Sequence, residues 1–367
     1  MRKYKLSDLA KINSFSLLGK NKITEVKYLD TSNLISNEIV NFKIFKIGEG
    51  KIPSRAKRKV KQNTILYSTV RPNQKHFGIL KNLDFSNILV STGFCTIDVD
   101  DNIADPDFIY YYITQDIMVE KMQSLAEQST TSYPSITPND IKNIDINLPQ
   151  IDIQRKVGKI LSNIENKIKL NNKINDNLEK QMHLIFKDIM AKSTNNKIKG
   201  EFIVAKNLTQ VITGKEDANF SVKNGRYKFF TCSNEPLKCD EYKFNNSSVL
   251  IAGNGDFNVK HYTGKFNAYQ RTYVLTPKKD YYALLYLSCA ERINTFKSKS
   301  TGSIVKFITK NDIENIPVFI PKDKNILNRL NKLLSLKEKK SKENEYLESL
   351  KDFLLPLLMN AQATISD

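Results

Sequence analysis

The chain of 367 residues has no tryptophan and only four cysteines. Four cysteines in a chain of this length do not make a disulfide framework, so we expect reduced thiols and a cytoplasmic protein. There is no CxxC pair and the three histidines are scattered, which argues against structural zinc. No apolar run approaches the roughly 20 residues that span a bilayer. The first residues, MRKYKLSDLAKINSF, lack the apolar stretch of a signal peptide, so we expect neither secretion nor a membrane partner.

Motifs that would bring catalysis are also missing from the sequence. No GxxxxGK[ST] loop for ATP is present, and the GxG at residues 253–255 lacks the third glycine of a dinucleotide fingerprint. The Asn/Asp-Pro-Pro-aromatic motif of amino-methyltransferases is absent, and DPDF at residues 105–108 comes nearest to it. The Glu-x-Lys pairs have no convincing partner aspartate for a nuclease metal site. We therefore expect a chain that is not itself an enzyme and that holds no metal or cofactor.

Charge is what the sequence has in excess. Lys and Arg number 57 against 39 Asp and Glu, which gives a net charge of +18. Such a balance favours a polyanionic partner, above all a nucleic acid. A compositional bias offers a second explanation, because only 9 of the 57 bases are Arg and because Asn, Ile and Lys dominate the whole chain.

The sequence contains an internal repeat. TPNDIKNIDINLP at Thr137–Pro149 recurs as TKNDIENIPVFIP at Thr309–Pro321, with seven of the thirteen residues identical. Weaker similarity links NTILYSTVRP at Asn63–Pro72 with SSVLIAGNG at Ser247–Gly255, each a β-branched run that ends in turn residues. The matched Asn-Asp-Ile and Leu/Ile-Pro residues of the first pair, at a fixed offset, indicate a duplicated unit.

A long heptad pattern follows each copy of the repeat. In the first, steps of four and three pass through Val157, Leu161, Ile164, Ile168, Asn171, Asn175, Leu178, Met182, Ile185 and Ile189. In the second, they pass through Ile326, Leu330, Leu333, Lys337, Lys340, Asn344, Leu347, Lys351, Leu354 and Leu358. Each helix would be roughly 55 Å long. A parallel pair would require the compact unit between the helices to span that length, so we expect an antiparallel pair.

The middle of this heptad seam is polar. Its residues are Asn171, Asn175, Lys337, Lys340 and Asn344. Three interpretations stay open: a solvated gap in an imperfect coiled coil, register specification by buried Asn, or a docking surface for another subunit.

Together these patterns predict an α+β fold class, with two globular domains separated by two long antiparallel coiled-coil helices in a pseudo-two-fold repeat. The domains are residues 1–150, a first long helix at 151–192, residues 193–322, and a second long helix at 323–360. We expect strands at Ile44–Ile47, Thr64–Val70, Gly93–Val99, Ser247–Ile251 and Thr272–Leu275. We expect helices at Pro106–Met122 and Tyr281–Phe296.

Candidate DNA-binding residues occur in both domains. Six cations lie within eleven residues without an acid and could contact phosphates, although a solvated lysine-rich loop would look the same: Lys51, Arg55, Lys57, Arg58, Lys59 and Lys61. Side chains of the types that read base edges follow a predicted strand in each domain. They are Arg71, Asn73, Gln74, Lys75 and His76 in the first, and Asn254, Asn258, Lys260, His261, Gln270 and Arg271 in the second.

With these features the chain resembles the specificity subunit of type I restriction–modification systems. The residues that carry the resemblance are LYSTVRP at 66–72, SITPNDIKNIDINLPQIDIQRKVGKILSNIENKI at 135–168, and the partial second copy at 309–359. The resemblance implies that each globular domain is a target-recognition domain for one half of a split double-stranded DNA sequence. The long helices would then be the spacer and the docking surface.

The same resemblance implies partner proteins. Two modification subunits would supply S-adenosylmethionine and methyl transfer, and two restriction subunits, where present, would use ATP and Mg²⁺ for translocation and cleavage. The chain itself would be non-catalytic. The second copy departs from the family pattern because the element Gln154-Arg155 is not duplicated.

Two other functions stay open. A single-chain DNA methyltransferase or nuclease with recognition domains would act on DNA unaided. A coiled-coil scaffold for proteins would show no salt-sensitive, sequence-selective DNA binding.

Overall fold

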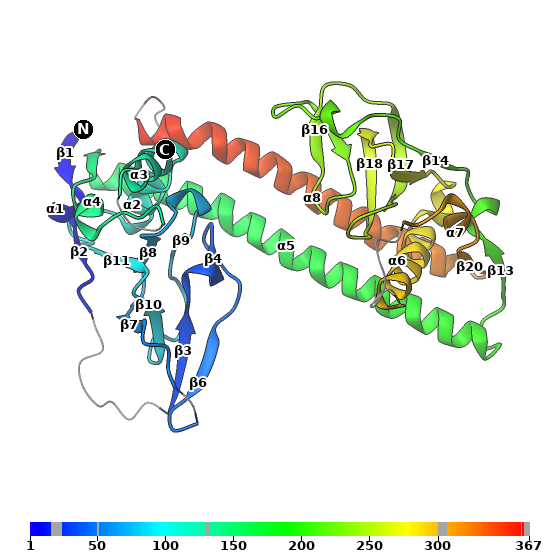
Figure 1. The fold of residues 1–367 in the computed structure, drawn as a ribbon, viewed down its shortest axis with the longest axis horizontal. Coiled ribbons are helices and arrows are strands. Elements are labelled where there is room, and N and C mark those ends of the chain that lie inside the picture. The colour runs from blue at the N-terminus through cyan, green and yellow to red at the C-terminus, as the bar shows by residue number, and fades with distance from the viewer. Residues whose placement is uncertain (16–23, 50, 130–132, 300–306, 361, 363–367) are drawn as a thin grey trace. The chain divides into compact units, whose positions relative to one another are not determined.

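The computed structural model describes residues 1–15, 24–49, 51–129, 133–299, 307–360 and 362 (Figure 1). The chain divides into two compact units, and each contains one globular domain together with a segment of both long helices. Unit 1 consists of Met1–Ile168 and Tyr346–Asp367, and unit 2 consists of Lys169–Glu345. The boundary between the units therefore crosses both long helices.

The globular part of unit 1 combines short strands with short helices. Its strands are β1 (Arg2–Lys5), β2 (Ala10–Ile12), β3 (Glu25–Leu29), β4 (Leu34–Ile35), β5 (Glu38–Ile39), β6 (Lys43–Lys46), β7 (Ala56–Lys59), β8 (Ile65–Ser68), β9 (Phe77–Ile79), β10 (Ile88–Ser91), β11 (Phe94–Val99) and β12 (Asp145–Leu148). Its helices are α1 (Leu6–Leu9), α2 (Pro106–Ile113), α3 (Asp116–Glu127) and α4 (Pro138–Lys142), with the 3-10 turns η1 (Thr31–Asn33) and η2 (Pro72–Gln74).

Unit 2 has a related set of elements. Its strands are β13 (Gly200–Val204), β14 (Val211–Thr213), β15 (Tyr227–Phe230), β16 (Leu237–Cys239), β17 (Phe244–Ala252), β18 (Val259–Ala268), β19 (Thr272–Leu275) and β20 (Pro317–Pro321). Its helices are α6 (Tyr282–Lys299) and α7 (Lys310–Glu314), with the 3-10 turns η3 (Ala205–Asn207), η4 (Ala218–Phe220) and η5 (Lys279–Tyr281).

The same strand order lies at the centre of both units. In unit 1 the sheet β2-β11-β8-β9 is antiparallel throughout, and in unit 2 the antiparallel order β14-β19-β17-β18 repeats it. Each unit also pairs its first strand with the strand before the long helix, as β1-β12 and β13-β20. The additional strands differ, because unit 1 builds a separate sheet β6-β3-β10-β7 while β15 and β16 extend the central sheet of unit 2. The duplicated unit predicted from the sequence is confirmed.

The repeated Thr-x-Asn-Asp sequence forms the same helix start in both units. Thr137 Oγ1 accepts from the Asp140 N–H at 3.3 Å, and Asp140 Oδ2 accepts from the Thr137 N–H at 2.7 Å. Thr309 and Asp312 repeat this pair of contacts at 3.2 and 2.8 Å. Each is a capping box, which satisfies backbone donors that the first turn of α4 or α7 leaves free.

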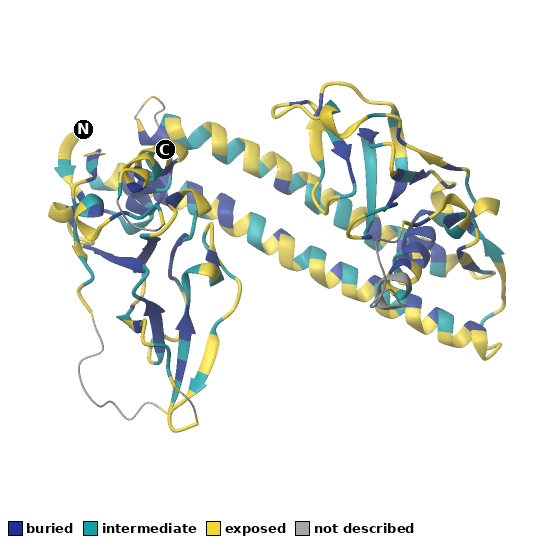
Figure 2. Ribbon diagram, in the orientation of Figure 1, coloured by how far each residue is buried: buried dark blue, intermediate teal, exposed yellow. Residues whose placement is uncertain are grey.

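The long helices are α5 (Ile151–Thr194) and α8 (Lys324–Met359). Every residue of the two predicted heptad series is buried or half-buried, and Figure 2 shows buried positions alternating with exposed ones along both helices. Within unit 2, Asn171 of α5 contacts Asn344 of α8, and Glu179 of α5 contacts Lys337 of α8. Residue numbers therefore rise along α5 while they fall along α8, as in an antiparallel pair. Within unit 1, Leu358 packs into the core that holds Leu161. The α+β fold class with a long antiparallel helix pair is confirmed.

The polar middle of the seam is buried rather than solvated at its centre. Asn171 is 0% exposed and Asn344 is 7% exposed. Asn171 Nδ2 donates to Asn344 Oδ1 at 2.8 Å, and Asn344 Nδ2 donates to Asn172 Oδ1 at 2.7 Å. The interpretation as a solvated gap is wrong for this pair, and the geometry is that of an Asn pair that specifies register.

One predicted helix is interrupted. Instead of a single helix over Pro106–Met122, α2 ends at Ile113 and α3 begins at Asp116. Thr114 Oγ1 donates to the Tyr110 carbonyl at 2.7 Å, and the backbone of Gln115 is extended. The spacing of apolar residues does not reveal the break, which lies where the Thr114 side chain bonds to the carbonyl four residues earlier.

The Gln154-Arg155 element joins two helix starts in unit 1. Gln154 is 2% exposed, accepts from the Asp105 N–H at 3.0 Å and donates to the Pro149 carbonyl at 2.9 Å. Its side chain therefore packs the start of α5 against the start of α2.

Among the described residues, no helix is both long and apolar enough to cross a membrane.

Candidate nucleic-acid interface

The six clustered cations of the first domain do not form a simple loop. Residues 56–59 are the edge strand β7, which pairs antiparallel with β10. Lys51, Arg55, Lys57 and Lys61 are exposed, and Lys59 is half-buried. Exposed cations therefore lie on β7 and in the segments on either side of it, where they could contact phosphates.

Arg58 differs from its neighbours because it reaches into the domain. Its Nε is buried and has no hydrogen-bond partner among the described residues. Burial of the guanidinium lowers the pKa of Arg58. Arg58 is therefore less suited than Lys57 to contact a phosphate at the surface.

The loop after β8 presents Arg71 in a constrained conformation. Its φ of 48° is in the left-handed region, which a residue with a long side chain rarely adopts. The Arg71 N–H donates to the Pro134 carbonyl at 2.9 Å, and the guanidinium lies 4.9 Å from the centre of the Tyr133 ring. Asn73 is tied to α3, since its N–H donates to Gln123 Oε1 at 3.2 Å. The backbone thus fixes an exposed arginine on an exposed aromatic ring.

Two other residues of this loop have partners within the protein. The Lys75 ammonium lies 2.7 Å from a carboxylate oxygen of Asp116. His76 Nδ1 is 2.8 Å from the Leu34 carbonyl oxygen. Gln74 and Arg71 are exposed, so they are better placed than Lys75 and His76 to contact DNA.

In unit 2 the corresponding segment after β17 is held by its own polar contacts. Asn258 Nδ2 donates to the Cys232 carbonyl at 2.9 Å, and Lys260 Nζ donates to Asn258 Oδ1 at 2.5 Å. Burial lowers the pKa of the Lys260 ammonium. Asn254 is half-buried, while Gln270 and Arg271 are exposed in the turn between β18 and β19.

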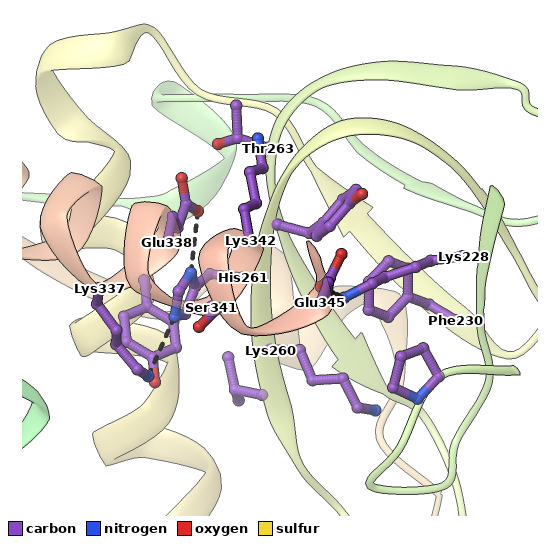
Figure 3. A pocket seen from close by; sticks show the side chains of 14 residues that line it. Lys228, Phe230, Lys260, His261, Thr263, Lys337, Glu338, Ser341, Lys342 and Glu345 are labelled. Atoms are coloured by element: carbon purple, nitrogen blue, oxygen red, sulfur yellow. Dashed lines mark hydrogen bonds and ion pairs between the residues drawn. The ribbon is translucent and has the colours of Figure 1, made fainter. Parts of the chain in front are cut away.

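His261 faces the long helix rather than the surface. Its Nδ1 lies 3.0 Å from Glu338 Oε1, and its Nε2 lies 3.2 Å from Lys337 Nζ (Figure 3). Lys337 also donates to Glu179 at 2.5 Å. His261, Lys337 and Glu338 line a cavity of about 280 Å³ beside β18. Both ring nitrogens of His261 are therefore engaged within unit 2.

Glu179 of α5 is a strongly ionised member of this cluster. Its burial raises the pKa, but hydrogen bonds from His183, Lys337 and Tyr286 outweigh that effect and bring the pKa to about 2.

Among the described residues, no group of three or more His, Cys, Asp or Glu side chains could hold a metal ion. The arrangement offers cations, amides and aromatic rings rather than a set of metal ligands.

Sequence reasoning missed several residues that the fold brings together. Tyr133 lies 62 residues from Arg71 in the chain and has no motif of its own. Glu165 and Glu338 lie on long helices whose other acids are mostly exposed. Only their positions beside the seam could have indicated in the sequence that they are buried.

A family model for the type I restriction modification DNA specificity domain matches residues 1–180 and residues 187–349. This chain belongs to that family. The resemblance to specificity subunits inferred from the sequence is confirmed, and the two matches correspond to the two copies of the repeat.

Individual relatives match part of the chain. The Type I restriction enzyme EcoDI specificity subunit of Escherichia coli is 37% identical over 164 residues, which is 43% of this chain and 37% of the relative. The HindI specificity subunit of Haemophilus influenzae is 28% identical over 186 residues, 51% of this chain and 40% of the relative. The matched parts thus span about two fifths of these relatives.

A solved structure shares the fold over the whole chain. The S subunit of a type I restriction-modification system from M. genitalium is 17% identical, with a TM-score of 0.59, and the match covers 100% of this chain and 96% of that subunit.

Proposed function

We propose that this chain recognises a two-part sequence in duplex DNA and directs partner modification subunits to it. The observation that carries the proposal is the repeated specificity domain: two copies share a central strand order while the loops after β8 and β17 carry different side chains. A scaffold repeated with different loops is suited to reading two different half-sites.

The two domains offer residues suited to two kinds of DNA contact. The exposed cations on and beside β7 would contact phosphates and orient the duplex. Arg71 and Gln74 of the first domain, and Gln270 and Arg271 of the second, would read base edges, because guanidinium and amide groups match guanine and adenine. The internal contacts of Lys75, His76, Asn258, Lys260 and His261 favour a supporting role for those five.

Catalysis would come from partner proteins. Two modification subunits would bind S-adenosylmethionine and transfer the methyl group, and restriction subunits, where present, would use ATP and Mg²⁺. The relatives are named as specificity subunits of restriction enzymes, which supports a non-catalytic role for this chain.

Selection from random DNA tests the proposal. The chain, alone and with its modification subunit, is incubated with a library of random duplexes, and the bound molecules are sequenced. We expect two conserved segments separated by an unconserved gap of fixed length. With S-adenosylmethionine, methylation should require the added subunit.

Two results would contradict the proposal. Methylated or cut DNA produced by the isolated chain would identify a single-chain enzyme. Absence of any enriched sequence, together with salt-insensitive binding of proteins, would identify a scaffold.

A further inference from the structure

A largely buried glutamate side chain lies at the same distance from the start of each long helix, beside the heptad seam. Glu165 lies fourteen residues after Ile151, the first residue of α5, and Glu338 lies fourteen residues after Lys324, the first residue of α8. Their side chains are only 12% and 15% exposed. In each case the carboxylate is oriented toward the globular domain of its own unit.

In unit 1, Glu165 connects the helix to two parts of the domain. Tyr111 of α2 donates its hydroxyl to Glu165 Oε2 at 3.0 Å. Asn37, from the turn between β4 and β5, donates Nδ2 to the same oxygen at 2.7 Å. Asn37 Oδ1 in turn accepts from the Ile79 N–H of β9 at 3.0 Å, so the contact continues into the central sheet.

In unit 2, Glu338 makes an equivalent pair of contacts. Tyr282, the first residue of α6, donates its hydroxyl to Glu338 Oε1 at 2.7 Å. His261 of β18 lies 3.0 Å from the same oxygen, as the dashed line in Figure 3 marks. Both glutamates thus contact a tyrosine from the helix after the central sheet. The second partner differs, because it is Asn37 of the β4–β5 turn in unit 1 and His261 of β18 in unit 2.

A gain in the stability of the folded protein does not explain why these two carboxylates are buried. Removing an ion from water is costly, and apolar replacements of similar size often stabilise a protein. Buried polar contacts do, however, penalise every arrangement that leaves them unpaired. An acceptor with two donors from different elements therefore selects one orientation of the domain on the helix.

We propose that Glu165 and Glu338 are positioning residues, each fixing its recognition domain on the adjoining helix and so sharpening the choice of gap between half-sites. The inference rests on the proposed function. It concerns the gap alone, because neither glutamate lies in a loop that would read bases.

The test uses the full chain and a matched set of duplexes. Half-sites recovered with the wild-type protein are placed at gaps varied one base pair at a time, and Kd is measured for each duplex. The variants are Tyr111→Phe/Glu165→Met in unit 1 and Tyr282→Phe/Glu338→Met in unit 2. Each replaces the tyrosine–glutamate contact by apolar groups of similar size and also removes the carboxylate that Asn37 or His261 contacts.

We expect each double variant to reduce the preference for the best gap over its neighbours by about tenfold, the order of one charge-assisted hydrogen bond. Discrimination against substituted bases within each half-site should not change. The control Glu120→Met removes an acid at an exposed position of α3 and should keep the wild-type gap preference. If a double variant does not fold, Tyr111→Phe or Tyr282→Phe alone removes one hydroxyl and gives the same comparison.

The outcomes separate this inference from the proposed function. A wild-type protein without sequence-selective binding overturns the proposed function. A selective wild-type protein whose folded variants keep its gap preference overturns the positioning role. Loss of base discrimination at unchanged gap preference also overturns it, since the glutamates would then support the reading loops.

Discussion

Arg71 is an exposed candidate DNA-reading residue whose backbone is constrained. Its left-handed backbone and its stacking on Tyr133 restrict the guanidinium to few orientations. A planar group with several donors, held in place before binding, loses less entropy when it pairs with a guanine. Lysine at this position would keep the charge but lose the planar fork.

Arg71→Lys should therefore weaken the reading of one base pair in the first half-site. We expect a loss of roughly 1–3 kcal/mol of discrimination there and none in the second half-site. Affinities for duplexes with single-base substitutions measure it. Arg271→Lys is the matched variant for the second half-site, and an equal effect of either change on both half-sites would disprove separate readers.

A second prediction at this scale concerns the cations beside and on β7. Lys51→Gln/Lys57→Gln should weaken binding to all sequences, because phosphate contacts carry no base information. The log–log slope of affinity against salt should fall by up to about 0.9 for each phosphate that the variant no longer neutralises. Titrations at several salt concentrations provide the slope.

The matched control for the basic strand is Lys11→Gln/Lys121→Gln, which removes the same charge from exposed positions on β2 and α3. If both pairs flatten the slope equally, the strand contributes only to the general charge of the protein.

At the scale of elements, the buried Asn171–Asn344 pair makes the helix seam specific. Asn171→Leu alone removes the amide that donates to Asn344 Oδ1 and should destabilise the protein by about 1–3 kcal/mol. Asn171→Leu/Asn344→Leu should recover that stability, since Leu at both positions continues the apolar seam. Urea unfolding of the two single variants and the double variant yields the coupling energy.

Asn163, which is exposed on α5, provides the control for this cycle. Asn163→Leu should change stability by no more than about 0.5 kcal/mol. Additive effects of the two seam substitutions would show that the asparagines do not act as a pair.

The elements also show what the sequence could predict. The heptad series and the Thr-x-Asn-Asp repeat act through neighbours a few residues away, so pattern alone located α5, α8 and the repeated segment that precedes each of them. The edge strand β7, by contrast, depends on a tertiary partner, the strand β10. Likewise, His261 was grouped with reading residues because its contact, Glu338, lies 77 residues away in the chain.

At the scale of the whole molecule, helix length should determine the gap between half-sites, because α5 and α8 each contribute a segment to both units. The contacts Asn171–Asn344 and Asn175–Ser341 show where the helices can be lengthened in register. Seven residues inserted after Lys173 and seven after Lys342 would add one heptad to each and preserve the seam.

This double insertion lengthens the helix pair by about 10 Å. Duplex DNA advances about 3.4 Å per base pair, so the preferred gap should grow by about three base pairs. The half-site sequences should stay the same, because no reading loop changes within its domain. Three added base pairs also turn one half-site around the duplex axis, so affinity should fall where the DNA has to twist to follow. Binding to duplexes with gaps varied one base pair at a time decides the matter, with the heptad inserted into α5 alone as the control that cannot extend both helices. An unchanged best gap at undiminished affinity would mean that the helix pair does not measure the distance between half-sites.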